Sequence, residues 1–207
     1  KARIGVLVGP KRAHSLSMGT FHSIFSRILR VEADKLGYNS GFTIYDEADS
    51  RSLIKSIVKE MGLDDKAYNP ASVHSRISMA KNHLVMAEQY ANDQEVLKRD
   101  SDSKQSEIFR IYQAYQQRCL KANAMDFDDL LVMTWRLFKE HEDVRKKYAE
   151  RFQYVLVDEY QDTNYVQQCI VLQLTKDNQR VCVVGDDAQS IYGFRGANID
   201  NILDFQK

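Results

Sequence analysis

Two short apolar segments near the end of the chain constrain its fold more strongly than any other feature of the sequence. Residues 154–157 and 181–184 are continuous apolar runs rich in β-branched side chains, and a helical pattern lies between them at 166–174. Strand, helix and strand in this order are typical of a parallel sheet, and uninterrupted apolar strands indicate a sheet covered on both faces. The sequence therefore predicts an α/β fold with a parallel sheet in this region.

Helical periodicity dominates the rest of the chain. From Thr20 onward, apolar residues recur at the i, i+3, i+4, i+7 and i+8 positions of one helix face, and Thr20 is a suitable N-cap. Asp46 and Pro70 are also residue types that begin helices. From these patterns we expect further helices at 46–61, 71–91, 108–119 and 127–138.

Three other segments carry weaker signals. Residues 1–8 are predicted to form the end of a helix followed by a strand, residues 42–45 a brief extended piece, and residues 100–106 an exposed turn or loop. No convincing strand pattern occurs between residues 46 and 121. We therefore expect an α-helical insertion that interrupts an α/β domain.

The composition excludes several classes of protein. The 207 residues are 43% hydrophobic and 28% charged, which is typical of a globular chain with one or two domains. No apolar run approaches the roughly 18 residues that a membrane span requires. Cys119, Cys169 and Cys182 are isolated and lack metal-ligand spacing, so we expect small core residues in a reducing, cytoplasmic environment.

The 29 basic and 29 acidic residues balance overall but are unevenly distributed. Residues 1–30 contain Lys and Arg but no Asp or Glu, whereas residues 126–162 are rich in carboxylates. A basic segment attracts phosphate backbones, and a carboxylate cluster can hold a divalent cation. Two solvated faces would give the same pattern, so charge alone does not decide between these interpretations.

The first candidate site is the acidic pair Asp158 and Glu159, which directly follows the predicted strand at 154–157. Ligands of open α/β folds bind at the carboxyl ends of the parallel strands, where this pair is expected. One carboxylate there can hold Mg²⁺ through water, and the next can orient an attacking water molecule. The same two residues could simply cap the following helix, so the pair alone leaves both interpretations open.

The second candidate site follows the predicted strand at 181–184 and is expected to face the same edge of the sheet. Gln189 offers an uncharged donor and acceptor, which suits the sensing of a terminal phosphate or the placing of a water molecule. Tyr192, Phe194 and Arg195 supply stacking surfaces and a cation, which suit single-stranded nucleic acid. Taken one by one, Tyr192 and Phe194 are more often core or surface aromatics than platforms for bases.

Four sequence blocks occur in a specific order. They are MGTFHS at 18–23, MDFDDLL at 125–131, DEYQD at 158–162 and VGDDAQSIY at 184–192. In this order they resemble motif Ib, the acidic element where the 1B insertion rejoins domain 1A, motif II and motif III of the UvrD/Rep/PcrA helicases of superfamily 1. The resemblance covers essentially the whole chain, although residues 46–121 support it only by position and helicity.

The resemblance implies a role for each matching position. Asp158 would bind Mg²⁺, Glu159 would activate the hydrolytic water, and Gln189 would contact the γ-phosphate of ATP and link it to DNA. The positions that would line the single-stranded DNA track are Thr20, Phe21, His22, Tyr192, Phe194 and Arg195.

Some of these positions depart from the family pattern or have a second interpretation. Phe194 stands where close relatives have Trp, so we expect a weaker stacking contact there. His22 lies on an amphipathic helix, and a His in that setting is more often a cap or a core partner than a ligand. Asp126 and Asp128 are expected to be a helix cap and a structural hydrogen-bond acceptor rather than catalytic groups.

The phosphate loop of that family, G-x-x-x-x-G-K-[ST], does not occur in the 207 residues. The nearest match begins at Gly5, but one residue too few separates its glycines, Pro10 removes an amide donor, and no Ser or Thr follows Lys11. By the resemblance, we expect that loop upstream of this segment and the arginines that meet the γ-phosphate downstream of it. The expected protein is therefore a longer helicase, of which this segment by itself is inactive.

The resemblance also implies a domain organisation and an activity. Residues 1–45 and 122–207 would form part of a RecA-like P-loop NTPase domain, with an incomplete parallel sheet, and residues 46–121 an all-α 1B-like insertion. The implied protein is an ATP-dependent DNA helicase that couples hydrolysis to movement along single-stranded DNA and to duplex unwinding. Its expected cofactors are Mg²⁺ and ATP, and its expected partners are single-stranded DNA, ss/ds DNA junctions and proteins of DNA repair or replication restart.

Two alternatives remain open at this point. One is the helicase part of a RecB- or AddA-like helicase–nuclease, and the other is a non-catalytic module that binds DNA or protein. A binding module would need none of Asp158, Glu159 and Gln189, so the presence of all three favours the helicase.

Overall fold

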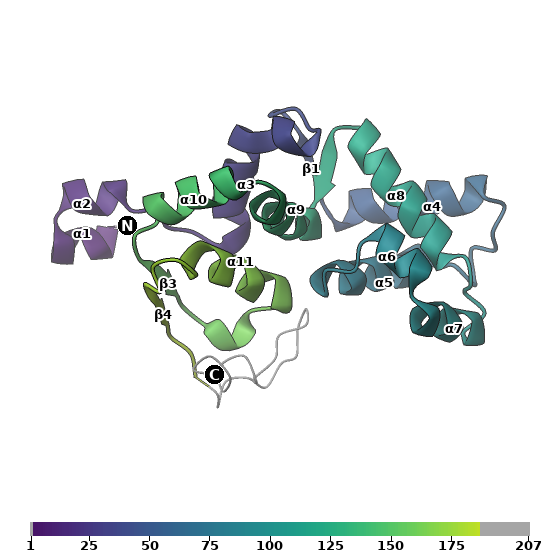
Figure 1. The fold of residues 1–207 in the computed structure, drawn as a ribbon. Coiled ribbons are helices and arrows are strands. Elements are labelled where there is room, and N and C mark those ends of the chain that lie inside the picture. Colours follow the sequence, from purple (N-terminus) through teal and green to yellow (C-terminus); the bar gives the residue numbers. More distant parts are fainter. Residues whose placement is uncertain (1, 187–207) are drawn as a thin grey trace.

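A computed structural model of the chain describes residues 2–186, which are mainly helical with a few three-residue strands. Figure 1 shows an elongated molecule with α1 and α2 at one end, α4–α8 at the other, and α3, α9, α10 and α11 between them. In chain order the elements are α1 (Ala2–Val8), α2 (Pro10–Ser15), α3 (Phe21–Glu32), η1 (Ala33–Leu36), β1 (Thr43–Tyr45), α4 (Glu47–Glu60), α5 (Pro70–Asn82), α6 (Ala87–Asn92), α7 (Gln94–Asp102), α8 (Ile108–Lys121), β2 (Ala124–Asp126), α9 (Phe127–Glu140), α10 (Glu142–Arg151), β3 (Val155–Val157), η2 (Tyr160–Asp162), α11 (Tyr165–Thr175) and β4 (Val181–Val183).

The helical segment α4–α8 leaves the rest of the molecule and returns to it at one place, the parallel pair β1–β2. Tyr45 at the end of β1 lies opposite Asp126 at the end of β2. Each strand leads into a helix that begins with an Asp N-cap, and both Asp46 and Asp126 form a capping box. The predicted extended piece and the predicted Asp46 cap are confirmed, and no strand lies between β1 and β2, as expected.

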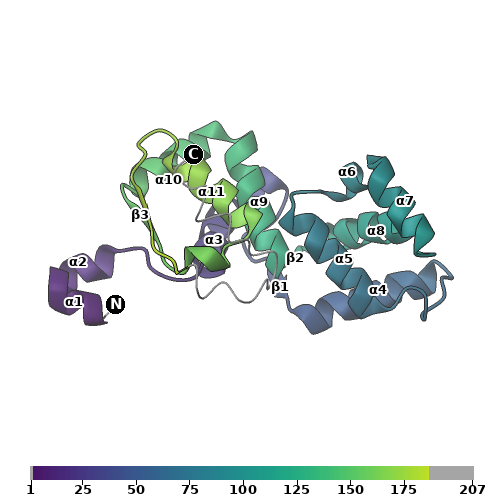
Figure 2. The ribbon, with the colours of Figure 1, turned by 90° about the horizontal axis from the view of Figure 1, so that it is seen from below.

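Helices α4–α8 lie together at one end of the molecule (Figure 2), and they enclose a hydrophobic core of their own. Its central side chains come from helices α4, α5, α6 and α8 and are almost fully buried: Ile54, Ile57, Val58, Val73, Ile77, Tyr90, Ile108, Ile111, Tyr112 and Tyr115. Burying each large apolar side chain contributes about 1.5–3 kcal/mol, so this core alone can hold the five helices together.

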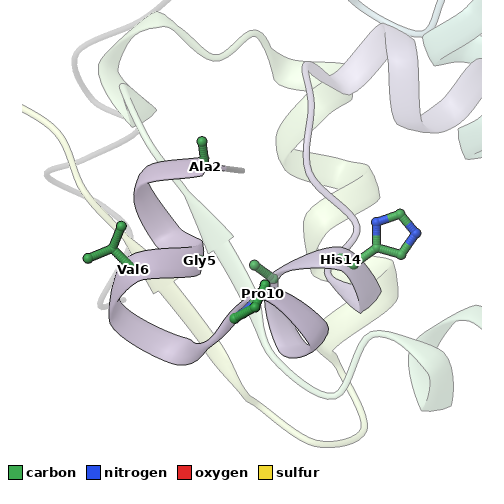
Figure 3. Close-up of a pocket in the computed structure, with 6 residues that line it drawn as sticks. Ala2, Gly5, Val6, Pro10 and His14 are labelled. Carbon is green, nitrogen blue, oxygen red and sulfur yellow. The ribbon is translucent and has the colours of Figure 1, made fainter.

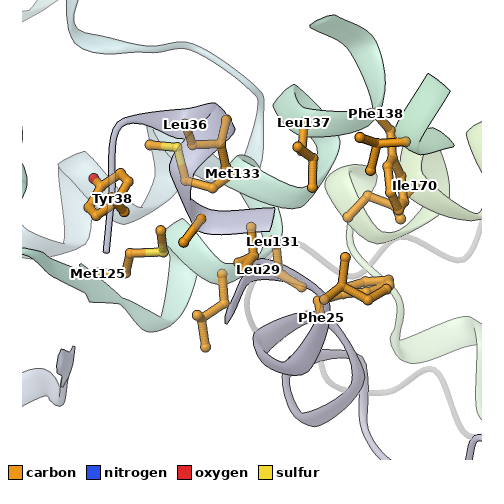
Figure 4. Packing of buried hydrophobic residues seen from close by; sticks show 14 of the residues in the cluster. Phe25, Leu29, Leu36, Tyr38, Met125, Leu131, Met133, Leu137, Phe138 and Ile170 are labelled. Carbon is orange, nitrogen blue, oxygen red and sulfur yellow. The ribbon is translucent and has the colours of Figure 1, made fainter. Parts of the chain in front are cut away.

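A second hydrophobic core lies around α9, on which α3, α10 and α11 pack. Figure 4 shows side chains from α3, α9, α11, β2 and the segment 36–38 that meet in this core: Phe25, Leu29, Leu36, Tyr38, Met125, Leu131, Met133, Leu137, Phe138 and Ile170. Residues far apart in the sequence meet in this core, and the helical segment α4–α8 contributes only Leu84 and Met86 at its margin.

The predicted strand–helix–strand unit is present, because β3 and β4 pair in parallel and α11 connects them. Its inner side packs Val157 against Tyr160 and Val171. The other side is open within residues 2–186, where Leu156 is 76% exposed. The prediction of a sheet covered on both faces is therefore wrong for the described part of the chain, because α11 packs against one side only.

Residues 2–15 form a helical hairpin rather than the predicted helix end and strand. The backbone N–H of Gly9 donates to the C=O of Gly5 at 3.0 Å, so the helical pattern of α1 continues up to the turn. Gly9 has φ 88°, which allows the chain to reverse into α2. A pocket between the two helices is lined by Ala2, Gly5, Val6, Pro10, Ala13 and His14 (Figure 3). The predicted strand is absent because this segment packs on α2 instead of pairing with another strand.

The single helix predicted at 71–91 is divided into α5 and α6. Leu84, at φ 59°, has a left-handed backbone conformation between them. The N–H of Val85 donates to the C=O of Ala80 at 2.9 Å and thereby closes the end of α5. This ending was missed because a left-handed residue at a helix end is usually Gly, and Leu gives no such signal.

The exposed turn or loop predicted at 100–106 is wrong for its first part, because α7 continues through Asp102, but residues 103–106 form a largely exposed turn as predicted. Asp100 is completely buried and pairs with Arg76 on α5. The hydroxyl of Tyr90 donates to the second carboxylate oxygen of Asp100 at 2.6 Å. Asp100 therefore faces partners inside the bundle, whereas the polar residues at 101–104 are exposed to water.

Two further expectations concern the burial of the cysteines and the presence of membrane-spanning helices. Cys119 is buried as predicted, whereas Cys169 is half-buried and Cys182 is exposed on β4. The prediction of core cysteines is therefore right for one of the three. None of the helices within residues 2–186 is both long and apolar enough to cross a membrane.

Candidate functional site

The carboxyl ends of β3 and β4 lie side by side, and hydrogen bonds continue past the strands. The backbone N–H of Val184 donates to the C=O of Val157 at 2.8 Å, and the N–H of Tyr160 donates to the C=O of Val184 at 2.9 Å. Tyr160 is buried, so the turn at 158–162 is anchored to the end of β4. The acidic pair therefore lies at the strand edge where the sequence placed it.

Asp158 and Glu159 are both exposed at this edge. Glu159 has φ 50° and ψ 45°, a left-handed conformation that is uncommon for residues other than Gly. Its N–H donates to Oδ1 of Asp158 at 3.0 Å, which helps to hold the turn. Within residues 2–186 neither carboxylate forms an ion pair. Backbone strain of this kind is concentrated at functional sites.

The alternative interpretation of the pair as a helix cap is wrong. The N-cap of α11 is Asn164, whose side chain accepts a hydrogen bond from the N–H of Gln167 at 2.9 Å. Glu159 precedes η2 but makes no side-chain capping bond to it. The two carboxylates are thus not used to begin the following helix.

A buried glutamine connects the acidic pair to β4. Nε2 of Gln161 donates to Oε2 of Glu159 at 2.5 Å, and Oε1 of Gln161 accepts from the backbone N–H of Asp186 at 3.1 Å. Asp186 is the last described residue after β4. Gln189, Tyr192, Phe194 and Arg195 lie outside the described residues, so their predicted roles at this edge remain predictions.

The predicted turn at the start of α3 is well defined. Oγ1 of Thr20 accepts a hydrogen bond from the N–H of Ser23 at 3.3 Å, which confirms Thr20 as the N-cap. Gly19 precedes it with φ 155°, and a Cβ built there would lie 2.3 Å from Oγ of Ser23. The first turn of α3 contains no acidic residue, so the positive end of this helix is not neutralised by its own side chains.

Phe21 and His22 have different surroundings. Phe21 is half-buried and packs against both the α9 core and the small cluster of Val157, Tyr160 and Val171. It thereby places the start of α3 beside the acidic turn. The ring of His22 meets the edge of the Phe127 ring, with centroids 5.7 Å apart. This contact agrees with the interpretation of His22 as a packing partner and does not test a DNA contact.

A second group of carboxylates is buried where α5 meets β2 and α9. Nζ of Lys81 lies 2.7 Å from Oδ2 of Asp126 and 2.7 Å from Oδ1 of Asp129. The hydroxyl of Tyr115 donates to the same oxygen of Asp126 at 2.9 Å. Lys81 is only 1% exposed, and its ammonium group lies 5.2 Å from the centre of the Tyr115 ring. We refer to Lys81, Asp126, Asp129 and Tyr115 as the buried ionic cluster.

Burial and neighbouring charges both shift the pKa values in this cluster, and their balance differs from residue to residue. Burial alone would lower the pKa of Lys81, but Asp126 and Asp129 raise it well above its ordinary value. Burial and then the neighbouring Asp126 raise the pKa of Asp129 to about 7. For Asp126, burial is outweighed by Lys81, whose charge and hydrogen bond lower the pKa of this carboxyl. The cluster therefore carries a charged Asp126 and an Asp129 that titrates near neutrality.

Asn82, the neighbour of Lys81, joins three helices. Its Nδ2 donates to Oδ1 of Asp128 on α9 at 3.2 Å, and its Oδ1 accepts from Nδ2 of Asn164 at 2.7 Å. Asn164 caps α11 and follows the acidic turn closely. The expected structural roles of Asp126 as a helix cap and Asp128 as an acceptor are confirmed.

The sequence analysis did not single out Lys81, Asn82, Asn164 or Gln161. One signal for Lys81 was present: Val73, Ile77 and Lys81 follow one another at intervals of four, which places the lysine on the buried face of α5. Asn164 has the residue type of an N-cap. Gln161 gave no signal of its own, because its two partners become neighbours only when β4 pairs with β3.

Short parallel strands among helices, with an acidic pair at the strand ends, are consistent with an α/β helicase domain. The family model of the UvrD/REP helicase N-terminal domain matches residues 1–207, and the chain belongs to this family.

Named relatives agree with this assignment. The chain is 44% identical over 207 residues to the ATP-dependent DNA helicase PcrA of Bacillus subtilis (strain 168), which covers 100% of this chain and 27% of that protein. It is 42% identical over 218 residues to the ATP-dependent DNA helicase UvrD1 of Mycobacterium leprae (strain TN), covering 100% of this chain and 28% of that protein. For PcrA of Leuconostoc citreum the identity is 38% over 207 residues, with coverages of 100% and 27%. The chain thus spans only about a quarter of the length of these relatives.

Proposed function

We propose that the chain is part of an ATP-dependent DNA helicase, in which hydrolysis at the β3–β4 edge is coupled to movement along single-stranded DNA and to duplex unwinding. The observation that carries this proposal is the pair Asp158 and Glu159, exposed and without an ion pair in the described residues, at the carboxyl end of a parallel strand. Membership of the UvrD/REP family and the names of the relatives agree with it.

The residues present fit a Mg²⁺ ion that is held mainly by water and phosphate. Asp158 offers exposed carboxylate oxygens, which are the hard donors that Mg²⁺ prefers. Within residues 2–186 no group of three or more His, Cys, Asp or Glu side chains could form a complete metal cage. A bound Mg²⁺ would neutralise the charge that develops on the phosphates. Asp158 would be its protein ligand, most simply through water.

Glu159 is proposed to act on the water that attacks the γ-phosphorus of ATP. As the water oxygen forms its bond to phosphorus and the bond to the bridging oxygen of ADP breaks, a carboxylate oxygen of Glu159 would accept the proton of that water. Its exposure allows it to reach a substrate. The proposed partner of Glu159 at the γ-phosphate is Gln189, outside the described residues.

The start of α3 is proposed to contact single-stranded DNA through Thr20, Phe21 and His22. Support comes from the unneutralised N-terminal end of α3, because backbone N–H groups and the helix dipole attract phosphates there. Phe21 connects this helix start to the acidic turn by packing on Val157 and Tyr160. Tyr192, Phe194 and Arg195 are proposed to complete the DNA track.

We propose the domain organisation that the sequence indicated: residues 1–45 and 122–207 as part of a RecA-like domain, and residues 46–121 as an inserted helical unit. Two features support this proposal. β1 and β2 bring the two ends of the helical segment together in parallel register. The helical segment also has a hydrophobic core that is separate from the core around α9.

The decisive test is Glu159→Gln in the full-length protein. This change removes the proton acceptor but keeps the size of the side chain, so ATP turnover in the presence of single-stranded DNA is expected to fall by about 10²-fold or more. Binding of ATP and of single-stranded DNA should stay close to normal. Steady-state ATPase assays and equilibrium binding of a fluorescent nucleotide and a labelled oligonucleotide measure both quantities.

A matched control is Glu150→Gln, because Glu150 is an exposed glutamate on α10, outside the acidic turn. Its turnover should equal that of the unchanged protein. Near-normal ATPase activity of Glu159→Gln would remove Glu159 from its proposed role. Strand displacement on tailed duplexes would measure unwinding and junction preference in the same proteins. As part of the proposed helicase function, we also propose a role in DNA repair or replication restart. The 207-residue segment alone is expected to show no ATPase activity, because it contains no phosphate-loop sequence.

A further inference from the structure

The side chain of Gln161 forms hydrogen bonds both to the acidic turn and to the segment that follows β4. It is 1% exposed, although a glutamine next to exposed carboxylates would ordinarily face water. Its amide nitrogen donates to Glu159 at 2.5 Å, and its amide oxygen accepts from the N–H of Asp186 at 3.1 Å. Both ends of this buried amide are therefore satisfied.

The orientation of this amide is fixed by its surroundings. A backbone N–H can only donate, so the amide oxygen of Gln161 must face Asp186. The amide nitrogen is then directed at Glu159, whose carboxylate can accept. At this position a carboxylate could not donate to Glu159, and an alkyl side chain could make neither bond.

The position of Gln161 follows from the packing of its neighbours. Tyr160 is buried in the cluster with Val157 and Val171, and its N–H is bonded to the C=O of Val184. The hydroxyl of Thr163, also buried, donates to the C=O of Tyr160 at 2.6 Å. Gln161 is thus held on both sides, whereas Glu159 is an exposed side chain on a left-handed backbone. An exposed glutamate has several rotamers available, and a hydrogen bond from a fixed donor selects among them.

We propose that Gln161 is a positioning residue, which sets the direction of the Glu159 carboxylate and fixes it relative to the segment that begins after β4. This proposal rests on the proposed function, because it assigns an action to Glu159. The segment that begins at Asp186 leads to Gln189, the proposed γ-phosphate contact. Gln161 therefore connects the group that is proposed to activate water to the segment of the chain that leads to Gln189.

The proposal predicts that loss of the Gln161 amide lowers kcat more than it changes binding. In the full-length protein, Gln161→Leu removes both hydrogen bonds at similar size, and Gln161→Glu keeps an acceptor but places a carboxylate against Glu159. Misplacement of a reacting group by about 1 Å can cost about 10²-fold in rate, so we expect kcat for ATP hydrolysis to fall by about tenfold or more in Gln161→Leu. Gln161→Glu is expected to fall further, while the KM for ATP changes by less than about twofold in both.

Gln173→Leu provides the matched control. Gln173 is a half-buried glutamine on α11, and its amide nitrogen donates to the backbone C=O of Trp135 at 3.3 Å, in the α9 core. The same loss of an amide at this place should leave kcat within about twofold of the unchanged protein. An equal loss of kcat in Gln173→Leu would show that any buried amide matters in this way and would overturn the proposal.

A double-mutant cycle separates positioning from general packing. If Gln161 acts through Glu159, then Gln161→Leu added to Glu159→Gln should lower the residual turnover by less than about twofold. An equal loss in both backgrounds would overturn the proposal. If Glu159→Gln loses turnover but Gln161→Leu and Gln161→Glu keep it, the proposed role of Gln161 is overturned and that of Glu159 stands. Near-normal turnover of Glu159→Gln would overturn the proposed function first and the role of Gln161 with it.

Discussion

Carboxylates lie at the ends of the parallel strands β2 and β3, and the structure places these two groups in opposite environments. Asp126 is the last residue of β2 and Asp129 lies in the first turn of α9; both are buried and share the ammonium group of Lys81. Asp158 and Glu159 follow β3, are exposed, and have no cationic partner in the described part of the chain. A similar sequence pattern thus produces a structural joint in one place and a candidate reactive site in the other.

The two groups of carboxylates differ in the source of the positive charge that compensates them. A buried carboxylate is tolerated only when a partner repays its loss of hydration, and Lys81 with Tyr115 does so inside the protein. An exposed carboxylate keeps its hydration and stays free to interact with a ligand. The comparison therefore predicts that changes in the buried ionic cluster affect stability, whereas changes in the acidic turn affect turnover.

The largest effect on stability is expected for Lys81→Met. This change leaves Asp126 and Asp129 buried without their cation, which costs about 3–5 kcal/mol in the free energy of unfolding. Urea unfolding followed by circular dichroism measures the loss. The control is Lys55→Met on the exposed face of α4, which should change stability by less than about 0.5 kcal/mol. Equal stabilities of the two variants would mean that the cluster does not hold α5 against α9.

Replacing either of the two buried aspartates by Asn should lower the free energy of unfolding, but by different amounts. The pKa of Asp126 is lowered by Lys81, whereas burial and Asp126 raise the pKa of Asp129 to about 7. A neutral amide is therefore a poorer substitute for Asp126 than for Asp129. At pH 7 we expect Asp126→Asn to cost about 3 kcal/mol and Asp129→Asn about 1 kcal/mol, measured by the same unfolding experiment. The reverse order would contradict the assignment of the charge to Asp126.

The raised pKa of Asp129 also predicts a pH dependence of stability. The unfolded chain loses this proton near pH 3.8, but the folded chain keeps it until about pH 7. The folded state therefore binds more protons over this window, so the contribution of Asp129 is complete below about pH 4 and is lost as the pH rises through 7. Relative to Asp129→Asn, the unchanged chain should lose stability between pH 4 and pH 8. A difference that stays constant across this range would show that Asp129 does not titrate there.

The smallest effect on stability is expected at the acidic turn. Asp158→Asn and Glu159→Gln change exposed side chains that form no ion pair in the described residues, so each should alter the free energy of unfolding by less than about 0.5 kcal/mol. The same two changes are expected to abolish most ATP turnover. A large loss of stability in either variant would show that the turn has a structural role like that of the buried ionic cluster.

The local parts of this comparison were predictable from the sequence. The sequence predicts that Thr20, Asp46 and Asp126 begin helices, and all three are N-caps in the structure. Such predictions succeed because a cap depends on residues within one turn of the chain. The strands at the acidic turn were predicted from continuous apolar runs for the same reason. One prediction that failed depended on a distant partner, because Asp100 is buried against Arg76, 24 residues away in the sequence. The other failed for a local reason, since α5 ends at Asn82 and the left-handed residue that follows is Leu84 instead of a glycine.

By itself, the sequence determined where strands end, where helices begin, and which carboxylates follow a strand, because each of these depends on neighbours along the chain. Only the tertiary structure decided which carboxylates are neutralised and which stay exposed. Lys81 is 45 residues from Asp126 in the sequence, and Gln161 is 25 residues from Asp186. Such pairs form only when helices and strands pack, since a charge or an amide acts over a few ångströms of space, whatever the separation along the chain.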